Sequence, residues 1–329
     1  MQERNNIQCS TIINSQEDGS VIIQFNNIIK YFMFIIVIIY IEISNPQVTN
    51  THFLTIENIS MLVGTSETVR MFSNNLTSRE NAVKIRQWIA GIVDGDGHIY
   101  ISKKGYCTIE ISIEIRDIAC LSKIKNRYGG SIKSISNGNA FRYRLHHKEG
   151  IIKFICDING IFYNPTRIIQ FNNLCNLYNI TVLTSPNLIY NNAYLSGLFD
   201  SDGSIYINLK TNQIFVTISQ KNRYLLDLVC SVYGGKVYSN NANKSAYKWT
   251  VFRKEEVINL IDNYFHWNNC VSAKNKRFKI IKIFYIYSNT GVFSSKDTTV
   301  IRLREKFIEE WKQYHNVDYL KKRQSTFFI

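Results

Sequence analysis

Apolar residues recur at the spacing of one helix face between residues 83 and 93, and this run ends at Asp94 and Asp96. The pattern predicts a helix that finishes on two carboxylates. Residues 99–101 predict a short strand after it. From residue 108 to residue 115 every second residue is isoleucine and the intervening ones are Thr, Glu or Ser. This strict alternation predicts a strand with one buried face.

Further elements follow in a regular order. A helical pattern ends at Tyr128, where Gly129 and Gly130 supply a stop signal. Residues 131–145 predict a hairpin that turns at an Asn-Gly-Asn sequence, and a new helix begins at Lys148. The predicted order is α-β-β-α-β-β-α, which indicates an α+β fold.

The whole pattern occurs twice. DGDG at residues 94–97 matches DSDG at residues 200–203 with an offset of 106, and YGG at residues 128–130 matches YGG at residues 233–235 with an offset of 105. Matching landmarks in one order and at nearly one spacing indicate a tandem duplication. We expect pseudo-twofold halves at residues 81–182 and 193–290, joined by a linker at residues 183–192 that contains a proline and has no apolar period.

Two segments lie outside the repeat. Residues 1–80 form an N-terminal extension with an apolar run at 31–41, shorter than the roughly 20 residues that a membrane-spanning helix needs. A membrane span, a targeting or anchoring segment, and a vestigial or upstream-encoded segment all remain open for it. The polar residues 71–80 are expected to form a linker into the repeat. Residues 291–329 predict a charged helix, with Leu303, Phe307 and Trp311 on one face, and a basic end.

Composition adds a strong positive charge. The 329 residues include 39 Lys and Arg against 25 Asp and Glu, a net charge of +14, which favours a nucleic-acid partner over an anionic membrane surface. The cysteines form no CxxC pair, so the common zinc motifs are excluded. Neither a His-Asn-His metal site nor a Ser/His/Asp set stands out. The abundance of Ile, Asn, Lys and Tyr is typical of an AT-rich genome, such as that of an organelle.

Carboxylates at the end of an apolar helix need a compensating partner, because their desolvation is costly. Small residues interrupt both apolar runs at matching positions, Ala90 and Gly91 in the first half and Ser196 and Gly197 in the second. Small residues allow two helices to approach closely, so we expect the two helices to pair and their acidic ends to converge. Converging carboxylates repel unless a cation lies between them, and hard divalent ions such as Mg²⁺ prefer oxygen ligands. This arrangement predicts a metal-dependent phosphodiester hydrolase.

The two repeated strings resemble a known family. IAGIVDGDG at residues 89–97 and LSGLFDSDG at residues 195–203 resemble the two signatures of a LAGLIDADG homing endonuclease or intron maturase. The likeness covers about residues 81–287. It implies a monomer whose signature helices form the domain interface and whose two four-stranded sheets form a saddle over DNA. It also implies a double-strand cut across the minor groove that leaves short 3′ overhangs.

The resemblance implies roles for individual residues. Asp96 and Asp202 match the metal-binding acids, with Mg²⁺ as the cofactor and Mn²⁺ as a plausible substitute. Asp94 and Asp200 match acids that support the interface. Lys274 and Arg167 match basic residues that stabilise charge near the scissile phosphate. Lys221 and Lys276 are alternatives to Lys274.

The family often carries a glutamine that orients water, and Gln220 matches it. The first half has Ile115 at the position assigned to it, beside Glu114, so we expect unequal cutting of the two strands. By alternation Gln220 shares the buried face of its strand. It is therefore expected to reach the metal site only if the strand bends or bulges.

Target reading is expected from the polar faces of the strands, because a β-ribbon fits the major groove. Glu110 and Glu114 fit this surface poorly, since phosphate repels carboxylate. The candidate nucleic-acid contacts are Tyr100, Ser102, Lys104, Arg142 and Arg144 in the first half and Tyr206, Asn208, Lys210, Lys221 and Lys248 in the second.

Two readings of the function follow from the resemblance. The first is an intron-encoded endonuclease that cuts double-stranded DNA, and retention of both Asp96 and Asp202 favours it. The second is a maturase of the same fold that assists splicing of its own intron RNA, alone or together with cleavage. A membrane-associated protein without catalysis is a third reading, but it leaves the duplicated aspartates unexplained. The family and the composition together favour a mitochondrial location.

Overall fold

The computed structural model describes residues 66–135, 139–239 and 246–313. The chain divides between Arg79 and Glu80 into two compact units, and the larger unit contains both halves of the duplication. The apolar run at residues 31–41 lies outside the described residues. Within the described ranges, no helix is both long enough and apolar enough to span a membrane.

The first half folds in the expected order. A 3-10 turn at Ile115–Asp117 separates its second strand from the next helix. The elements are α3 (Ser66–Asp96), β1 (Gly97–Ile101), β2 (Cys107–Glu114), α4 (Ile118–Tyr128), β3 (Ser131–Ser134), β4 (Ala140–Leu145), α5 (Lys148–Ile158) and α6 (Pro165–Leu177).

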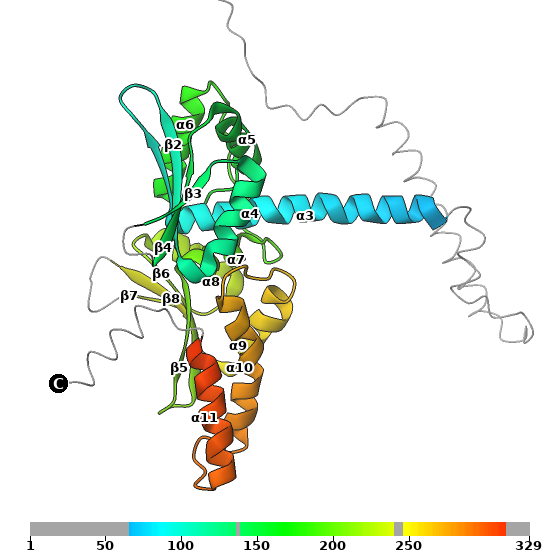
Figure 1. Cartoon of the computed structure of the whole chain (residues 1–329), viewed down its shortest axis with the longest axis vertical. Coiled ribbons are helices and arrows are strands. Elements are labelled where there is room, and N and C mark those ends of the chain that lie inside the picture. Colours follow the sequence, from blue (N-terminus) through cyan, green and yellow to red (C-terminus); the bar gives the residue numbers. More distant parts are fainter. Residues whose placement is uncertain (1–65, 136–138, 240–245, 314–329) are drawn as a thin grey trace, which may run out of the picture. The chain divides into compact units, whose positions relative to one another are not determined.

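The second half repeats this order. Its elements are α7 (Tyr194–Asp202), β5 (Gly203–Asn208), β6 (Gln213–Gln220), α8 (Arg223–Tyr233), β7 (Lys236–Ser239), β8 (Tyr247–Val251), α9 (Lys254–Asn259), a π-helix (Leu260–Phe265) and α10 (Lys274–Asn289), followed by α11 (Thr298–Gln313). The sheets have the orders β1-β2-β4-β3 and β5-β6-β8-β7, and all their pairings are antiparallel. The predicted α+β architecture is confirmed (Figure 1).

Each sheet has one face in the core and one face turned outward. On β2, the side chains of Ile109, Ile111 and Ile113 are buried, whereas Glu110 and Ser112 between them are not. The buried face packs against the helices of its own half, including α4 or α8. Because side chains alternate along a strand, the polar residues of the sequence pattern gather on the outer face.

The two halves meet where α3 and α7 cross, and Figure 1 shows α7 beside the C-terminal part of α3. A Cβ atom on Gly91 would overlap the carbonyl oxygen of Tyr194, and one on Gly197 would overlap that of Trp88. Only glycine permits backbones to approach this closely. Ala90 and Ser196 are buried beside these glycines. The expected pairing of the two helices at their small residues is therefore present.

Two expectations about the flanking segments need correction. Residues 71–80 were expected as a linker but belong to α3, because they contain neither proline nor glycine and nothing in them ends a helix. On α11, Phe307 and Trp311 are buried, and the ring of Phe307 contacts that of Phe284 on α10. Leu303 was expected on the same buried face but is 47% exposed.

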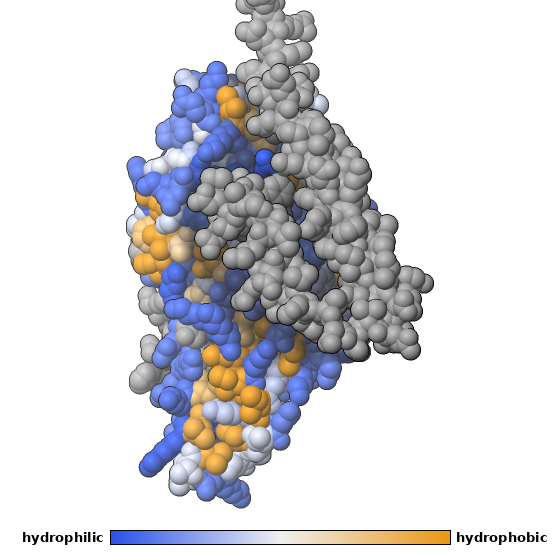
Figure 2. All heavy atoms as spheres, turned by 90° about the vertical axis from the view of Figure 1, so that its right-hand side faces the viewer, coloured by the Kyte–Doolittle hydropathy of each residue, from blue (hydrophilic) through white to orange (hydrophobic). Residues whose placement is uncertain are grey.

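Exposed apolar side chains also occur on the C-terminal helices. In Figure 2, hydrophobic residues gather on the lower part of the visible face, where α10 and α11 lie. The large hydrophobic residues that are exposed on these two helices are Ile283, Ile286 and Leu303. Scattered exposed apolar residues are ordinary on a protein surface.

Candidate active site

The two candidate metal-binding acids are the last residues of the crossing helices. Asp96 ends α3 and Asp202 ends α7, and each is followed at once by the first strand of its sheet. A Cβ atom on Gly95 would overlap the side chain of Ser201 and would lie 2.5 Å from Oδ2 of Asp202. The carboxylate of one half thus lies against the helix end of the other, so the predicted convergence is present.

The pKa values of the two acids reflect this crowding. Burial and, to a smaller extent, the nearby charge of Asp96 raise the pKa of Asp202 to about 7, while Lys274, Arg167 and a hydrogen bond from Gln220 oppose the shift. Desolvation also raises the pKa of Asp96, although part of the residue is open to solvent, and Lys274 and Arg167 again oppose this. Two acids that hinder each other's ionisation are stabilised by a cation placed between them.

The two basic residues have matching positions. Lys274 Nζ donates hydrogen bonds to the carbonyl oxygens of Phe199, Asp200 and Ser201, at 2.9, 2.7 and 3.1 Å. In the first half, Arg167 Nε donates to the carbonyl oxygen of Val93 at 3.0 Å, and Nη2 donates to that of Gly95 at 3.4 Å. Lys274 therefore caps the negative C-terminal end of α7 beside Asp202, and Arg167 caps that of α3 beside Asp96.

Gln220 reaches the site without any distortion of its strand. Its Nε2 donates a hydrogen bond to Asp202 Oδ2 at 2.5 Å. The pairing of β6 with β8 is regular up to Gln220, which lies opposite Tyr247, so the expected bend or bulge is wrong. The core-facing side of the strand end is also the side on which α7 ends. The alternation along the strand therefore predicted the face of Gln220 correctly. The prediction lacked only the position of the end of α7 on that same face.

The first half has no amide at the matching position. Ile113 lies opposite Phe141, as Gln220 lies opposite Tyr247, so Ile113 and not Ile115 occupies the place of the glutamine. The assignment from sequence was wrong because four residues separate Ile113 from α4 whereas two separate Gln220 from α8, and three of those four form the 3-10 turn. Ile113 is buried, so its position favours an apolar side chain.

The side chains of the 3-10 turn and of the neighbouring strand end have partners. Glu114 forms an ion pair with Arg116 at 2.7 Å. Asp117 Oδ1 accepts a hydrogen bond at 2.7 Å from the backbone N–H of Ala273, which immediately precedes Lys274. The first half thus helps to position the start of α10 and the lysine of the second half. This contact was not predictable from the repeat, because the turn has no counterpart in the other half.

Asp94 and Asp200, here called the inner aspartates, hold the interface together. Asp94 Oδ2 accepts hydrogen bonds from the backbone N–H groups of Tyr163 and Asn164 and from the hydroxyl of Tyr194, at 2.8, 3.0 and 2.6 Å. Burial raises the pKa of Asp94 to about 7, and these hydrogen bonds oppose the shift. Asp94 is thus joined to a residue of the other half.

Asp200 has an equivalent set of partners. Its oxygens accept from the backbone N–H groups of Val271 and Ser272, and Trp88 Nε1 of the first half donates to Oδ2 at 2.8 Å. Trp88 and Tyr194 are 106 residues apart and form reciprocal bonds across the interface. Neither residue was among the predicted interface residues, although their matched positions within the repeat were a usable signal.

The outer sheet faces carry the predicted nucleic-acid contacts. Tyr100, Arg142, Arg144 and Tyr206 are exposed on the strands, and Lys104 and Lys210 lie in the turns that follow β1 and β5. Lys221 is exposed just beyond β6. Ser102, Asn208 and Lys248 are half-buried, and Lys248 Nζ lies 5.0 Å from the ring centroid of Tyr206.

The two outer faces differ in chemistry. In the first half, Glu110 forms ion pairs with Arg144 at 2.6 Å and with Arg142 at 3.7 Å, which explains how a carboxylate is accommodated there. In the second half, the rings of Tyr206 and Phe215 stack with centroids 4.8 Å apart. The stacking of Tyr206 on Phe215 was not predicted from the sequence.

Comparison with known proteins gives concordant results. The LAGLIDADG endonuclease family profile matches residues 89–178 and 195–285. The chain is 34% identical over 302 residues to the intron-encoded RNA maturase bI4 of Saccharomyces cerevisiae, covering 82% of this chain and 46% of that protein. It is also 34% identical over 240 residues to the intron-encoded DNA endonuclease ai2b of Dictyostelium discoideum, covering 70% of this chain and 90% of that protein.

Solved structures agree in fold. The homing endonuclease I-LtrWI, solved bound to its target DNA, aligns with a TM-score of 0.54 at 17% identity, over 70% of this chain and 98% of that one. The present chain spans about half the length of the first two curated relatives that it matches.

Proposed function

Since the chain belongs to the LAGLIDADG endonuclease family, we propose that it is an intron-encoded homing endonuclease that makes a site-specific double-strand break in DNA. The observation that carries the proposal is the convergence of Asp96 and Asp202 at the ends of two crossing helices. Both helices lead directly into sheets with polar and basic outer faces. One pair of acids at a domain interface is suited to act on two strands of a duplex.

The two carboxylates suit a hard divalent cation such as Mg²⁺, for which Mn²⁺ can substitute. Within the described residues no group of three or more His, Cys, Asp or Glu side chains forms a closed metal site. Asp96 and Asp202 supply two carboxylates, which leaves room for phosphate oxygens and water, as Mg²⁺ prefers. When bound there, the metal would activate water and stabilise the leaving oxygen.

The surrounding side chains then have defined tasks. Gln220 donates its amide N–H to Asp202, so its amide oxygen is free to accept a hydrogen bond from an attacking water. Lys274 and Arg167 oppose the rise in the pKa of both acids and so favour their ionised forms. They also place positive charge where the phosphodiester gains negative charge in the transition state. Asp94 and Asp200 position the helices without touching the substrate.

The DNA would lie across the outer faces of the two sheets. The candidate contacts named above provide arginines and lysines for phosphates and for guanine, and amides and hydroxyls for other bases. The ion pairs of Glu110 hold Arg142 and Arg144 in place, which favours recognition of particular bases over general attraction. The halves at residues 81–182 and 193–290 would act as one monomer, in the mitochondrion of the organism that encodes it.

A maturase role is the second candidate. The observation that favours it is the 34% identity to an RNA maturase over 82% of this chain. The same protein can carry both activities, because cleavage depends on the acids and RNA binding depends on other surfaces. A splicing assay of the intron RNA with and without the protein separates the two.

Cleavage of a plasmid that carries the intronless host allele tests the main proposal. Purified protein with Mg²⁺ should convert the plasmid to linear DNA, and Asp96→Asn and Asp202→Asn should each lower the rate at least about a hundredfold. Glu305→Gln on α11 removes one negative charge far from these acids in sequence and serves as a matched control. Linear product formed at the wild-type rate by both aspartate variants would contradict the proposal.

A further inference from the structure

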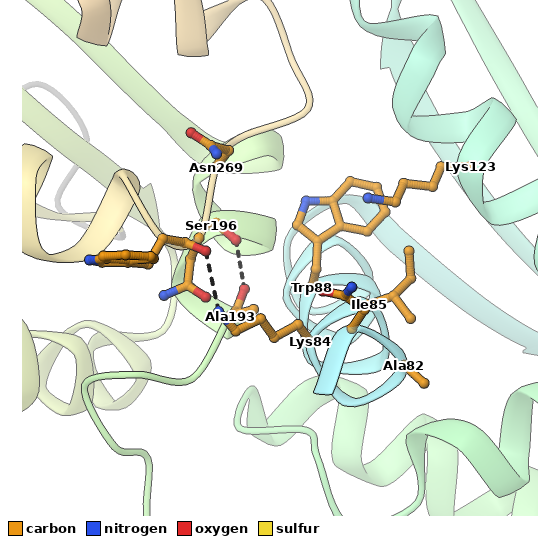
Figure 3. Close-up of a pocket in the computed structure, with 11 residues that line it drawn as sticks. Ala82, Lys84, Ile85, Trp88, Lys123, Ala193, Ser196 and Asn269 are labelled. Carbon is orange, nitrogen blue, oxygen red and sulfur yellow. Dashed lines mark hydrogen bonds between the residues drawn. The ribbon is translucent and has the colours of Figure 1, made fainter. Parts of the chain in front are cut away.

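A cavity of about 480 Å³ lies between the two halves, away from the candidate active site (Figure 3). Its walls come from α3 and α4 of the first half, and from the start of α7 and the turn after the π-helix in the second half. Lys84 precedes Asp96 by 12 residues on α3, and a helix of that length spans about 18 Å. The cavity therefore lies toward the opposite end of the helix pair α3 and α7 from Asp96 and Asp202.

The walls of this cavity, here called the interface pocket, combine cations, indoles and amides. Its main polar and aromatic residues are Lys84, Lys123, Trp88, Trp267, Asn268 and Asn269. None of the described lining residues is Asp or Glu. Since both charged residues are lysines, the pocket attracts an anion.

Each of the two lysines contacts a tryptophan of the interface pocket, one through the ring and one through the backbone. Lys123 Nζ lies 5.1 Å from the ring centroid of Trp88, and Lys84 Nζ donates a hydrogen bond to the carbonyl oxygen of Trp267 at 3.3 Å. Figure 3 shows Lys123 over the indole of Trp88, with Lys84 on the same helix as Trp88. One lysine therefore lies over an indole ring, and the other contacts the backbone of Trp267.

Trp267 is the most unusual residue of the interface pocket. It is 68% exposed, although tryptophan is usually kept from water. It lies two residues after the end of a π-helix, a rare distortion that is frequent at functional sites. The neighbouring Asn268 is buried, and its Oδ1 has no hydrogen-bond partner in the described part of the chain. An exposed ring beside an unsatisfied amide indicates a surface that is completed by a ligand.

We propose that the interface pocket binds an unpaired nucleotide of a single-stranded polynucleotide. The base stacks on the indole of Trp267, the phosphates lie near Lys84 and Lys123, and the asparagine amides accept or donate hydrogen bonds at the base edge. Aromatic stacking combined with cations is the usual basis of single-strand binding. RNA and a displaced DNA strand share this chemistry. Because the pocket is remote from Asp96 and Asp202, duplex DNA on the sheets does not compete with it.

Fluorescence anisotropy of the full-length protein with a short labelled oligoribonucleotide tests the proposal. A saturating amount of unlabelled duplex DNA is present to occupy the sheet faces. Trp267→Ala and Lys123→Glu should each weaken binding about tenfold, as expected for loss of one stacked base or of a phosphate contact. Lys125→Glu makes the same charge change two residues further along α4, outside the pocket, and should change affinity by less than about twofold. Thermal melts show that each variant is folded.

The outcomes separate the possible sources. Tighter binding of the ribonucleotide than of the same deoxyribonucleotide sequence would assign the pocket to RNA, and equal binding would assign it to any single strand. Unchanged binding by Trp267→Ala would overturn the proposal. Equal weakening by Lys123→Glu and Lys125→Glu would also overturn it, since binding would then follow general charge alone. The assay contains no cleavage step, so its result is independent of whether the protein cuts DNA.

Discussion

At the scale of single residues, the two halves present unequal surroundings to their carboxylates. Asp202 is held by the amide of Gln220, whereas the matching position of the first half is the buried, apolar Ile113. Lys274 and Arg167, by contrast, make equivalent contacts with the C-terminal ends of α7 and α3. The charges of the site are therefore nearly symmetric, while its ability to orient water is not.

This asymmetry leads to a prediction for strand cleavage. Gln220→Leu keeps the side-chain size but removes the hydrogen bonds, so cutting of the strand nearest Asp202 should slow by about a hundredfold. The other strand should be cut at nearly the wild-type rate. A gel that separates supercoiled, nicked and linear plasmid would show the nicked form accumulating. Ser231→Ala, on the exposed side of α8 and away from the outer sheet faces, is the control, and equal slowing of both strands by Gln220→Leu would contradict the asymmetry.

Most of these residues were accessible from sequence, because the repeat marks equivalent positions. The acids lie where the duplicated signatures place them, and Gln220, Lys274 and Arg167, which the family resemblance implied, lie beside them. The partner of Gln220 in the first half was misassigned, because the additional 3-10 turn shifts the count between the repeats. The contact of Asp117 with Ala273 was not predictable either, since it joins residues 156 positions apart that have no repeat relationship.

At the scale of elements, the crossing of α3 and α7 determines whether a shared site forms at all. The backbones touch at Gly91 and Gly197, and the reciprocal bonds of Trp88 and Tyr194 to the inner aspartates secure the crossing from both sides. Small residues in the apolar runs predicted this pairing. The helical state of residues 71–80 was not predicted, because a polar stretch without breakers is compatible with either a helix or a linker.

A single methyl group at the crossing should separate the halves. Gly197→Ala places a Cβ atom on the carbonyl oxygen of Trp88, so we expect a loss of about 2–3 kcal/mol in the free energy of unfolding. Activity should fall even at temperatures where the variant is folded, because Asp202 moves relative to Asp96. Denaturant unfolding measures the first effect, with Ser231→Ala on the exposed side of α8 as a control. Unchanged stability would show that the helices are not in contact.

At the scale of the whole molecule, the excess of lysine and arginine and the acids at the ends of α3 and α7 lie in different regions. The chain carries a net charge of +14, yet four acids lie at the ends of its interface helices, two of them buried. The positive charge attracts nucleic acid from a distance, and the acids require a cation before phosphate can approach closely. The interface pocket adds a second basic surface away from these acids.

Binding of duplex DNA should therefore depend steeply on salt. Each phosphate contact releases counterions, so raising monovalent salt from about 50 to about 200 mM should weaken binding by about a thousandfold. Anisotropy titrations with labelled target DNA, in Ca²⁺ in place of Mg²⁺, would measure this. A change of less than about tenfold would indicate that few lysines and arginines of the sheet faces contact phosphate.

The central claim is that Asp96 and Asp202 share a cation site between the two halves. Anomalous diffraction from crystals of the DNA complex soaked in Mn²⁺ tests it most directly. The account predicts anomalous density within about 2.5 Å of carboxylate oxygens of both residues. Density located elsewhere, with both carboxylates left without a metal, would contradict it.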